Sequence, residues 1–296
     1  MNYTGEIAGL ATAVCWTVTA MSFQVASRRI GSVSVNLIRL IFAFLFYLVY
    51  SKIFLGQWLP LDAPLKAWIY LSISGLIGFV IGDFFLFKSY EFISSKISML
   101  IMTLAPPVAA ILGWFMMGER FTLMNTLGML LVIAGVSMVI MKKDVENGVK
   151  KNRYPVKGIV FAFLGAVGQG VGAVFSKIGM GDYDPFASSQ IRVITGIIGF
   201  AIMISLMKRW PVVSKGLSDR KASKALVLGS FFGPFLGVSL GMVAFKFTSV
   251  GIASTLMATV PVFILVPSHL LLKEKLTVVE VFGAVFAVAG IAVFFL

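Results

Sequence analysis

The chain has 296 residues, of which 59% are hydrophobic and 12% charged, and its mean hydropathy is +0.98. A soluble domain carries roughly 25% charged residues, so this composition leaves too little polar surface to coat a water-soluble globule. The formal net charge is +13, but the basic residues lie in short connectors between apolar blocks, which argues against a nucleic-acid-binding surface.

The apolar residues fall into ten blocks, most of them about as long as a membrane span. About 20 residues of helix cross the hydrocarbon core, and a helix satisfies its own backbone hydrogen bonds there. We therefore predict an all-α membrane protein with ten transmembrane helices, near residues 5–27, 34–51, 66–88, 97–117, 122–141, 158–179, 185–207, 224–246, 252–272 and 277–296. We expect the first block to be retained, because it lacks the basic start of a cleaved signal peptide. The connectors are too short to bury a core, which predicts no soluble catalytic domain.

The basic residues of the connectors predict the orientation of these helices. With ten crossings, one side of the membrane carries 18 Lys and Arg residues and the other side carries 4. The side with 18 includes the polar linker 142–157. Because basic connectors tend to stay in the cytoplasm, we expect this linker to be cytoplasmic and both termini to lie outside the cytoplasmic membrane.

The two halves of the chain resemble each other. A shift of 155 residues aligns 78–140 with 233–295 without a gap, and 12 of the 63 positions are then identical. The matches include glycine, proline and glutamate, which hydrophobic bias alone does not explain. Earlier in each half, Ile38-Arg39 aligns with Ile191-Arg192.

This duplication predicts two five-helix repeats, 1–141 and 158–296, joined by the linker 142–157. Five is an odd number of crossings, so the second repeat enters the membrane from the opposite face and the repeats are inverted. Inverted repeats are typical of secondary transporters, because two nearly equivalent halves can exchange inward-open and outward-open states of similar energy.

The repeated segment resembles the EamA repeat of the drug/metabolite transporter superfamily over nearly the whole chain. The motifs that carry the resemblance recur in the same order in both halves: 97–105, Pro106, Gly118-Glu119-Arg120, Gly128 and Ala134-Gly135, then 252–260, Pro261, Lys273-Glu274-Lys275, Gly283 and Ala289-Gly290. The resemblance implies a ten-helix permease with a central cavity, lined mainly by helices 3, 4, 8 and 9 and flanked by helices 1 and 6. Family substrates include amino acids, other small metabolites and drugs, so the substrate does not transfer. Lys273 departs from the pattern, since glycine is expected there.

Asp83 is a carboxylate inside the third predicted helix. A charge at the centre of a membrane helix costs roughly 2.5 to 3.5 kcal/mol on insertion scales, so it needs a partner, a hydrated cavity or a proton. One interpretation is a cavity carboxylate that binds a substrate amine or a coupling proton. The other is a solvated group near the cytoplasmic end, about a turn and a half from Lys88. The second half has Val238 at the aligned position, so the role is not symmetric.

Arg39 and Arg192 open the second and seventh predicted helices, on opposite faces of the membrane. They suit attraction of a substrate anion or a gating ion pair, and Arg39 lies at a depth from which it can pair with Asp83. The simpler interpretation, which the sequence favours, is that both side chains snorkel to the interface.

Four further residues are candidates for lining the cavity. Pro106 and Pro261 interrupt the fourth and ninth predicted helices at matching places, and interrupted helices point to binding sites in transporters. Trp16 and Gln169 lie on the first and sixth helices, where each can contact ligand. The alternatives are a kink needed only for packing, and ordinary helix–helix contact.

Glu119 and Glu274 precede the fifth and tenth predicted helices, where an acid complements the helix dipole. We interpret both as structural, together with Gly128 and Gly283 of the same motif. His269 is the only histidine, and near a helix end it is more often interfacial than a proton relay.

These observations favour a secondary transporter that exports a small organic metabolite, such as an amino acid, by alternating access. The expected partners are a small-molecule substrate and the lipid bilayer; proton coupling, exchange and facilitated diffusion stay open, as do a monomer and a homodimer. One rival is an intramembrane aspartyl enzyme, which needs two carboxylates that share a proton, whereas the other five aspartates lie in connectors. The other rival is a non-transporting sensor or structural membrane protein. One histidine and one cysteine cannot build a metal site, and no phosphate-binding loop motif exists, so we expect no cofactor.

Overall fold

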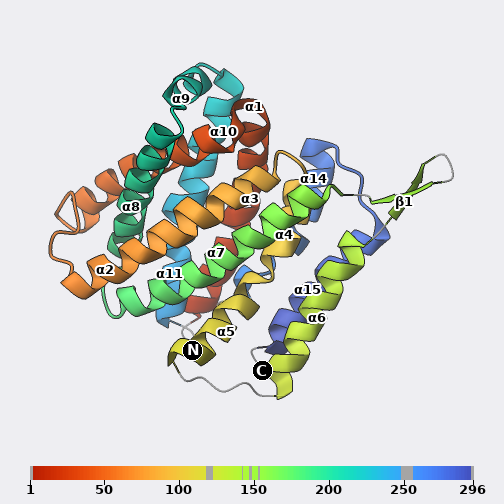
Figure 1. The fold of residues 1–296 in the computed structure, drawn as a ribbon. Helices are drawn as coiled ribbons and strands as arrows, with labels where there is room; N and C mark the ends of the chain where they lie inside the picture. The colour runs from red at the N-terminus through yellow and green to blue at the C-terminus, as the bar shows by residue number, and fades with distance from the viewer. Residues whose placement is uncertain are drawn as a thin grey trace.

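The computed structural model describes residues 3–117, 123–141, 143–146, 149–152, 154–247 and 256–294, and this part of the chain is mostly helical (Figure 1). Six helical segments are long and apolar enough to cross a membrane: Thr4–Phe54, Leu65–Ser89, Ser95–Leu112, Val156–Met180, Pro185–Leu206 and Arg220–Phe247. Three shorter apolar helices accompany them: Thr126–Ile140, Val260–Leu272 and Val278–Val293. The two termini lie at one end of the molecule, and helix α9 and strand β1 lie at the other (Figure 1).

Helix α1 (Thr4–Phe54) contains the first two predicted helices, joined by a bend rather than a loop. At the bend, Gly31 has φ 78° and ψ 153°, a conformation that glycine adopts without a side-chain clash. The Glu91 carboxylate accepts a hydrogen bond of 2.8 Å from the Ser32 N–H, which caps the helix after the bend. Beyond the bend, Ile41, Leu45 and Val49 are exposed at four-residue spacing, as expected for a helix face that contacts lipid.

The spans Leu65–Ser89 and Arg220–Phe247 each have a π-helical turn in the middle. Their parts are α2 (Leu65–Ser74), η1 (Gly75–Gly82), α3 (Asp83–Ser89), α10 (Arg220–Ser230), η2 (Phe231–Gly237) and α11 (Val238–Phe247). The two π segments end at Gly82 and Gly237, which the 155-residue shift aligns. Both spans are therefore irregular at the same place. π turns inside helices are frequent at functional sites.

The fourth and ninth predicted helices are broken near their prolines. The pieces are α4 (Ser95–Met102), α5 (Ala105–Met117), α13 (Val260–Phe263) and α14 (Leu265–Leu272). At each break a threonine hydroxyl, Thr103 or Thr259, donates to the carbonyl oxygen three residues earlier at 2.6 Å. The proline positions therefore mark real interruptions of the helices.

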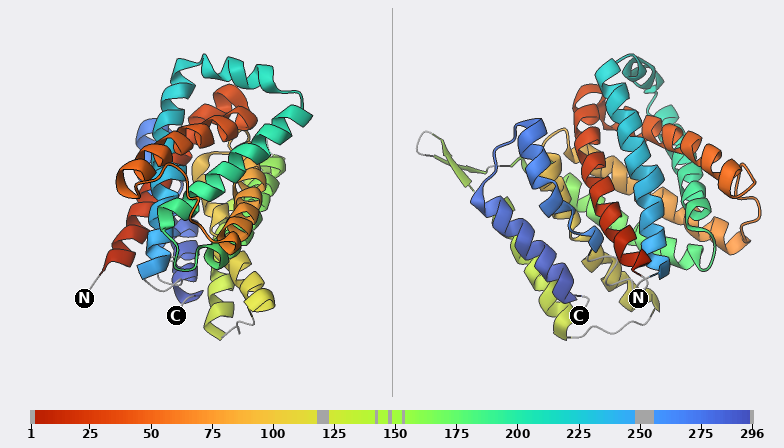
Figure 2. Two further views of the ribbon diagram at one scale, coloured as in Figure 1. Left: turned by 90° about the vertical axis from the view of Figure 1, so that its left-hand side faces the viewer. Right: turned by 180° about the vertical axis from the view of Figure 1, so that it is seen from behind.

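Helices α6 (Leu123–Ile140) and α15 (Val278–Phe294) pack side by side along glycines (Figure 2). A Cβ added to Gly290 would lie 2.8 Å from the Gly128 carbonyl oxygen, and one added to Gly283 would lie 2.8 Å from that of Gly135. Backbones therefore touch directly, as small residues permit in membranes. Because the later residue of one helix meets the earlier residue of the other, the two helices run antiparallel.

The remaining elements are α7 (Val156–Met180), α8 (Pro185–Leu206), α9 (Trp210–Leu217), β1 (Lys143–Glu146) and β2 (Val149–Asn152). The last three were not predicted from the sequence. The strands pair antiparallel, with Lys143 opposite Asn152, so the predicted linker contains a β-hairpin, while the apolar segments of the described chain are helical as predicted. Helix α9 falls in a stretch expected to be an irregular connector.

Helix α7 packs against the Leu65–Ser89 span through glycines on both sides. A Cβ added to Gly168 would lie 2.6 Å from the Gly82 Cα atom, and one added to Gly172 would lie 3.0 Å from the Gly78 Cα atom. This close approach brings Gln169 of α7 beside Asp83.

Candidate substrate site

Asp83 and Arg39 form an ion pair deep between the helices. The Arg39 Nη2 atom lies 2.6 Å from the Asp83 Oδ2 atom, and the two residues are only 2% and 5% exposed. Gln169 Nε2 donates to the other carboxylate oxygen, and also to the Gly78 carbonyl at 3.2 Å. Neither charge reaches solvent, so the interpretations of Asp83 as a solvated group and Arg39 as a snorkelling side chain are wrong.

Asn36 supports this pair from one turn before Arg39. Its side-chain amide donates to the carbonyl oxygens of Ser32 and Asp83 at 3.0 and 3.3 Å, and its Oδ1 atom accepts from the Arg39 Nε–H at 3.2 Å. Asn36 was not among the residues predicted from the sequence. A polar residue three positions before a membrane arginine lies on the same helix face, which is the signal that would have found it.

Aromatic rings surround the Arg39 guanidinium. Its Cζ atom lies 4.7, 5.5 and 5.8 Å from the ring centroids of Phe87, Phe79 and Phe23. Such cation–π contacts stabilise a positive charge where water is excluded. They also fix the arginine so that its donors face Asp83.

Arg192 from α8 joins the same group of residues. Its Cζ atom lies 4.6 Å from the centroid of the Phe79 ring that Arg39 also contacts, and the residue is 7% exposed. A Cβ added to Gly78 would lie 3.4 Å from Arg192 Nη2 and 3.8 Å from Gln169 Oε1. Arg192, too, does not snorkel. The structure thus brings together two arginines that were expected near opposite faces of the membrane.

Trp16 and Pro106 lie elsewhere among the described contacts. Trp16 packs against η2, where a Cβ added to Gly237 would lie 3.0 Å from the indole, and it joins an apolar cluster with Ala8 and Met257. Pro106 is the second residue of α5 and is half-buried. No described contact joins either residue to Asp83.

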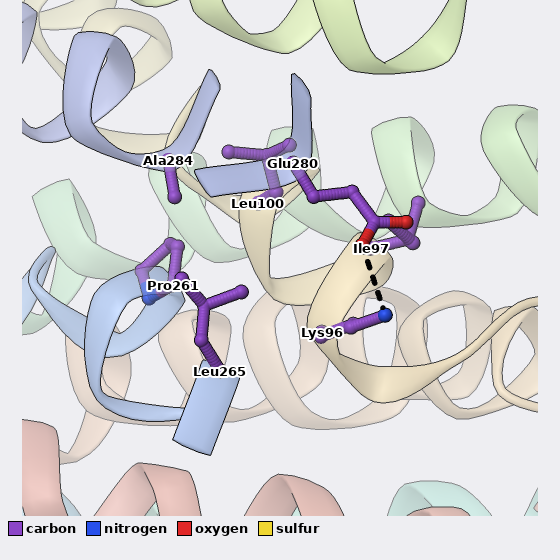
Figure 3. Close-up of a pocket in the computed structure, with 7 residues that line it drawn as sticks. All are labelled: Lys96, Ile97, Leu100, Pro261, Leu265, Glu280 and Ala284. Atoms are coloured by element: carbon purple, nitrogen blue, oxygen red, sulfur yellow. Dashed lines mark hydrogen bonds and ion pairs between the residues drawn. The ribbon is translucent and has the colours of Figure 1, made fainter. Parts of the chain in front are cut away.

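Pro261 belongs to a second group of residues, at the β-hairpin end of the molecule. Figure 3 shows it with Lys96, Ile97, Leu100, Leu265, Glu280 and Ala284 around a narrow space. There the Lys96 ammonium lies 3.0 Å from Glu280 Oε2 and donates to the Lys275 carbonyl at 2.7 Å. The Tyr154 hydroxyl donates to Glu280 Oε1 at 2.6 Å. This network, Lys96–Glu280–Tyr154, ties α4, α15 and the residues before α7 together.

Glu280, rather than Glu274, caps helix α15. The Thr277 N–H donates to Glu280 Oε2 at 3.1 Å, a capping-box bond that the sequence Thr-x-x-Glu signals. Glu274 instead accepts from Gln24 Nε2 at 3.0 Å, and its other oxygen lies 3.9 Å from Lys96 Nζ. Glu274 thus belongs to the Lys96 network, beside a cavity of about 360 Å³.

The other residues of the repeated motif have simple positions. Lys273 ends α14 with φ 54°, the left-handed conformation that glycine would adopt without strain. Gly128 and Gly283 lie at the contact between α6 and α15. Glu119 lies outside the described residues.

A family model of EamA-like transporters matches residues 3–141 and again 156–296. The chain belongs to the EamA-like transporter family. It is therefore a multi-pass membrane protein and a transporter rather than an enzyme, and the predicted family resemblance is confirmed.

The relatives of this EamA-like transporter are distant. It is 24% identical over 238 residues to a chloroplastic WAT1-related protein of Arabidopsis thaliana. The matched region covers 78% of this chain but only 56% of the plant protein. It is 25% identical over 219 residues to an uncharacterized transporter of Archaeoglobus fulgidus, covering 73% of this chain and 74% of that one. A solved crystal structure shares the fold, with a TM-score of 0.64 and 17% identity over 99% of this chain and 96% of the other.

Proposed function

We propose that this EamA-like transporter is a secondary carrier that exports a small organic metabolite, such as an amino acid, by alternating access. The observation that carries the proposal is the buried group formed by Arg39, Asp83 and Gln169. Its members come from both matched segments, since Gln169 lies in 156–296 and the other two lie in 3–141. A charged group shared by two halves inside the membrane is expected where a carrier binds its solute.

Three features support an inverted pair of five-helix repeats with ten crossings. Helices α6 and α15, which the 155-residue shift aligns, run antiparallel, as equivalent helices of inverted repeats must. The π turns ending at Gly82 and Gly237 recur at aligned positions. The breaks before α5 and α13 also recur, and such irregular helices allow two halves to rearrange around a shared site.

The network around Lys96 supports a gate at the β-hairpin end of the carrier. We place this end in the cytoplasm because of the basic linker, with both termini outside. The ion pair between Lys96 and Glu280 joins α4 to α15, one from each half. Breaking it would let the halves separate on that side, which alternating access requires.

The rival enzyme has no support at Asp83. A carboxylate that shares a proton with a second carboxylate needs that partner within hydrogen-bonding distance. Within the described residues, the two oxygens of Asp83 instead accept from Arg39 and Gln169. The arrangement suits binding and conformational change better than proton transfer to a substrate bond.

Solute counterflow into proteoliposomes tests the proposal. Candidate solutes come from comparing metabolites exported by cells with and without the protein. We expect Asp83→Asn to abolish counterflow of a solute that the wild type carries. The matched control is Asp219→Asn, which removes a carboxylate paired with Arg29 at the surface and should leave counterflow intact. Equal counterflow by the two variants would remove Asp83 from the transport site.

A further inference from the structure

Helix α8 carries two buried polar groups that lack partners, one turn apart. Ser188 is 0% exposed and Arg192 is 7% exposed. The Ser188 hydroxyl and the Arg192 Nε–H are both without a hydrogen-bond partner among the described residues. Residues four positions apart lie on the same face of a helix, so both donors lie on one side of α8. The neighbouring hydroxyl of Ser189 differs, since it donates to the Pro185 carbonyl at 2.8 Å.

The group around Phe79 carries an excess of positive charge. It contains the guanidinium groups of Arg39 and Arg192 and the single carboxylate of Asp83. Arg39 uses that carboxylate at 2.6 Å, while no ion pair joins Arg192 to a described acid. An uncompensated charge buried among helices destabilises the protein, so its retention calls for a function that needs it.

We propose that Ser188 and Arg192 form an anion subsite, and that the solute carries one carboxylate or a group of the same shape and charge. This inference rests on the carrier function proposed above and narrows its substrate class. A guanidinium presents parallel N–H donors that match the two oxygens of a carboxylate. The Ser188 hydroxyl supplies a third donor one turn away.

The carboxylate of a bound solute would offset the excess positive charge of this group of residues. The loaded group then resembles a neutral interior, which lowers the cost of moving it between helices during reorientation. Phe79 lies against the subsite and offers an apolar surface to the remainder of the solute. An inorganic anion such as chloride has the charge but lacks the two-oxygen geometry.

The first test needs no ligand and compares melting temperatures in lipid nanodiscs. If Arg192 binds the solute and has no partner within the protein, Arg192→Gln removes an unpaired charge and should raise the melting temperature by about 2–4 °C. Arg39→Gln removes a paired charge and should lower it. A fall with both variants would show that Arg192 has a structural partner, and would overturn the subsite.

The second test uses amino acids and simple monocarboxylates, each against its amide and against chloride. We expect carboxylates, but not amides or chloride, to raise the wild-type melting temperature, and Arg192→Gln to abolish this rise. Ser188→Ala should weaken carboxylate binding about tenfold, as loss of one hydrogen bond to a charged group predicts, while Ser189→Ala should not. No rise with any carboxylate, or an equal rise with amides or chloride, would overturn the proposal.

Counterflow separates this inference from the carrier function. A solute that is carried equally by the wild type and by Arg192→Gln would overturn the subsite and leave the carrier standing. A carboxylate that binds through Arg192 but is not moved across the bilayer would overturn the carrier and leave the subsite standing.

Discussion

Arg39 and Arg192 occupy aligned positions in the two halves of the chain, yet among the described residues only Arg39 has a carboxylate partner. The half that provides Arg39 has Asp83, and the aligned residue of the other half is Val238. Gln169, which binds Asp83, aligns by the same 153-residue offset as the arginines with Trp16, which packs against Gly237 beside Val238. The crossing of α7 with the Leu65–Ser89 span contains a carboxylate and an amide, whereas the corresponding crossing of α1 with the Arg220–Phe247 span has Trp16 and Val238 in their places. Duplication therefore supplied the scaffold, and divergence at two positions, Asp83/Val238 and Gln169/Trp16, concentrated the charge in one place.

The largest effect is expected when the carboxylate partner of Arg39 is removed. Asp83→Leu leaves the Arg39 guanidinium buried and unpaired, so we expect the free energy of unfolding to fall by about 3–5 kcal/mol. The double variant with Arg39→Leu should recover most of the loss, because it leaves neither charge. Reversible denaturation in detergent measures both. If the double variant is no more stable than the single one, the ion pair is not what balances this region.

The two helix crossings can also be compared through their glycines. Gly168→Ala would place a Cβ 2.6 Å from the Gly82 backbone, whereas Gly241→Ala would place one 3.2 Å from the flexible Met257 side chain. Overpacking against backbone costs about 1–3 kcal/mol, so we expect a loss of that size for Gly168→Ala and a clearly smaller one for Gly241→Ala. Thermal denaturation gives the ranking, and the reverse order would show that the polar crossing is the looser of the two.

The network around Lys96 is the proposed gate, and Glu280 is the residue through which it can be weakened. Glu280→Gln weakens its bond to Lys96, and a loss of about 1 kcal/mol would raise the population open toward the cytoplasm about fivefold. A cysteine at Ser94, which lines the adjoining cavity, reports this as faster labelling by a thiol reagent, in a chain whose Cys15 is replaced by serine. Asp219→Asn is the control, since its partner Arg29 lies at the surface. Unchanged labelling in Glu280→Gln would mean that the network does not close this side.

The smallest effect concerns the turn in which Lys273 departs from the family pattern. Lys273 and Lys208 both have left-handed backbone, with φ 54° and 53°. Changing either to glycine should raise the free energy of unfolding by about 0.5–1 kcal/mol, because the left-handed conformation strains other residues. Lys224→Gly, inside helix α10, should lower it by about 1 kcal/mol. A loss at Lys273 would show that its side chain contributes more than its backbone costs.

Composition and block length predicted most of the helices, because apolar residues in blocks of about 20 follow directly from the thickness of the bilayer. The sequence also showed Asp83, Arg39 and Gln169 to be candidates for the substrate site, since polar side chains are conspicuous in apolar segments. Composition and block length could not place Arg192 beside Phe79, because this contact depends on how glycines let separate helices approach. They missed Lys96 and Glu280, which looked like ordinary residues at helix ends, and the hairpin in the linker, whose polar residues show no apolar pattern.

The most direct test of two oppositely oriented halves that share one charged site is the membrane side of Lys52 and Lys208. Both are exposed and end the second predicted helix of their halves, at corresponding places. In a chain with Cys15→Ser, single cysteines at these positions are treated with a membrane-impermeant thiol reagent in intact cells. We expect labelling at position 52 and protection at position 208, because the halves are inverted. Labelling of both from outside, or of neither, would contradict the inverted arrangement and the alternating-access account built on it.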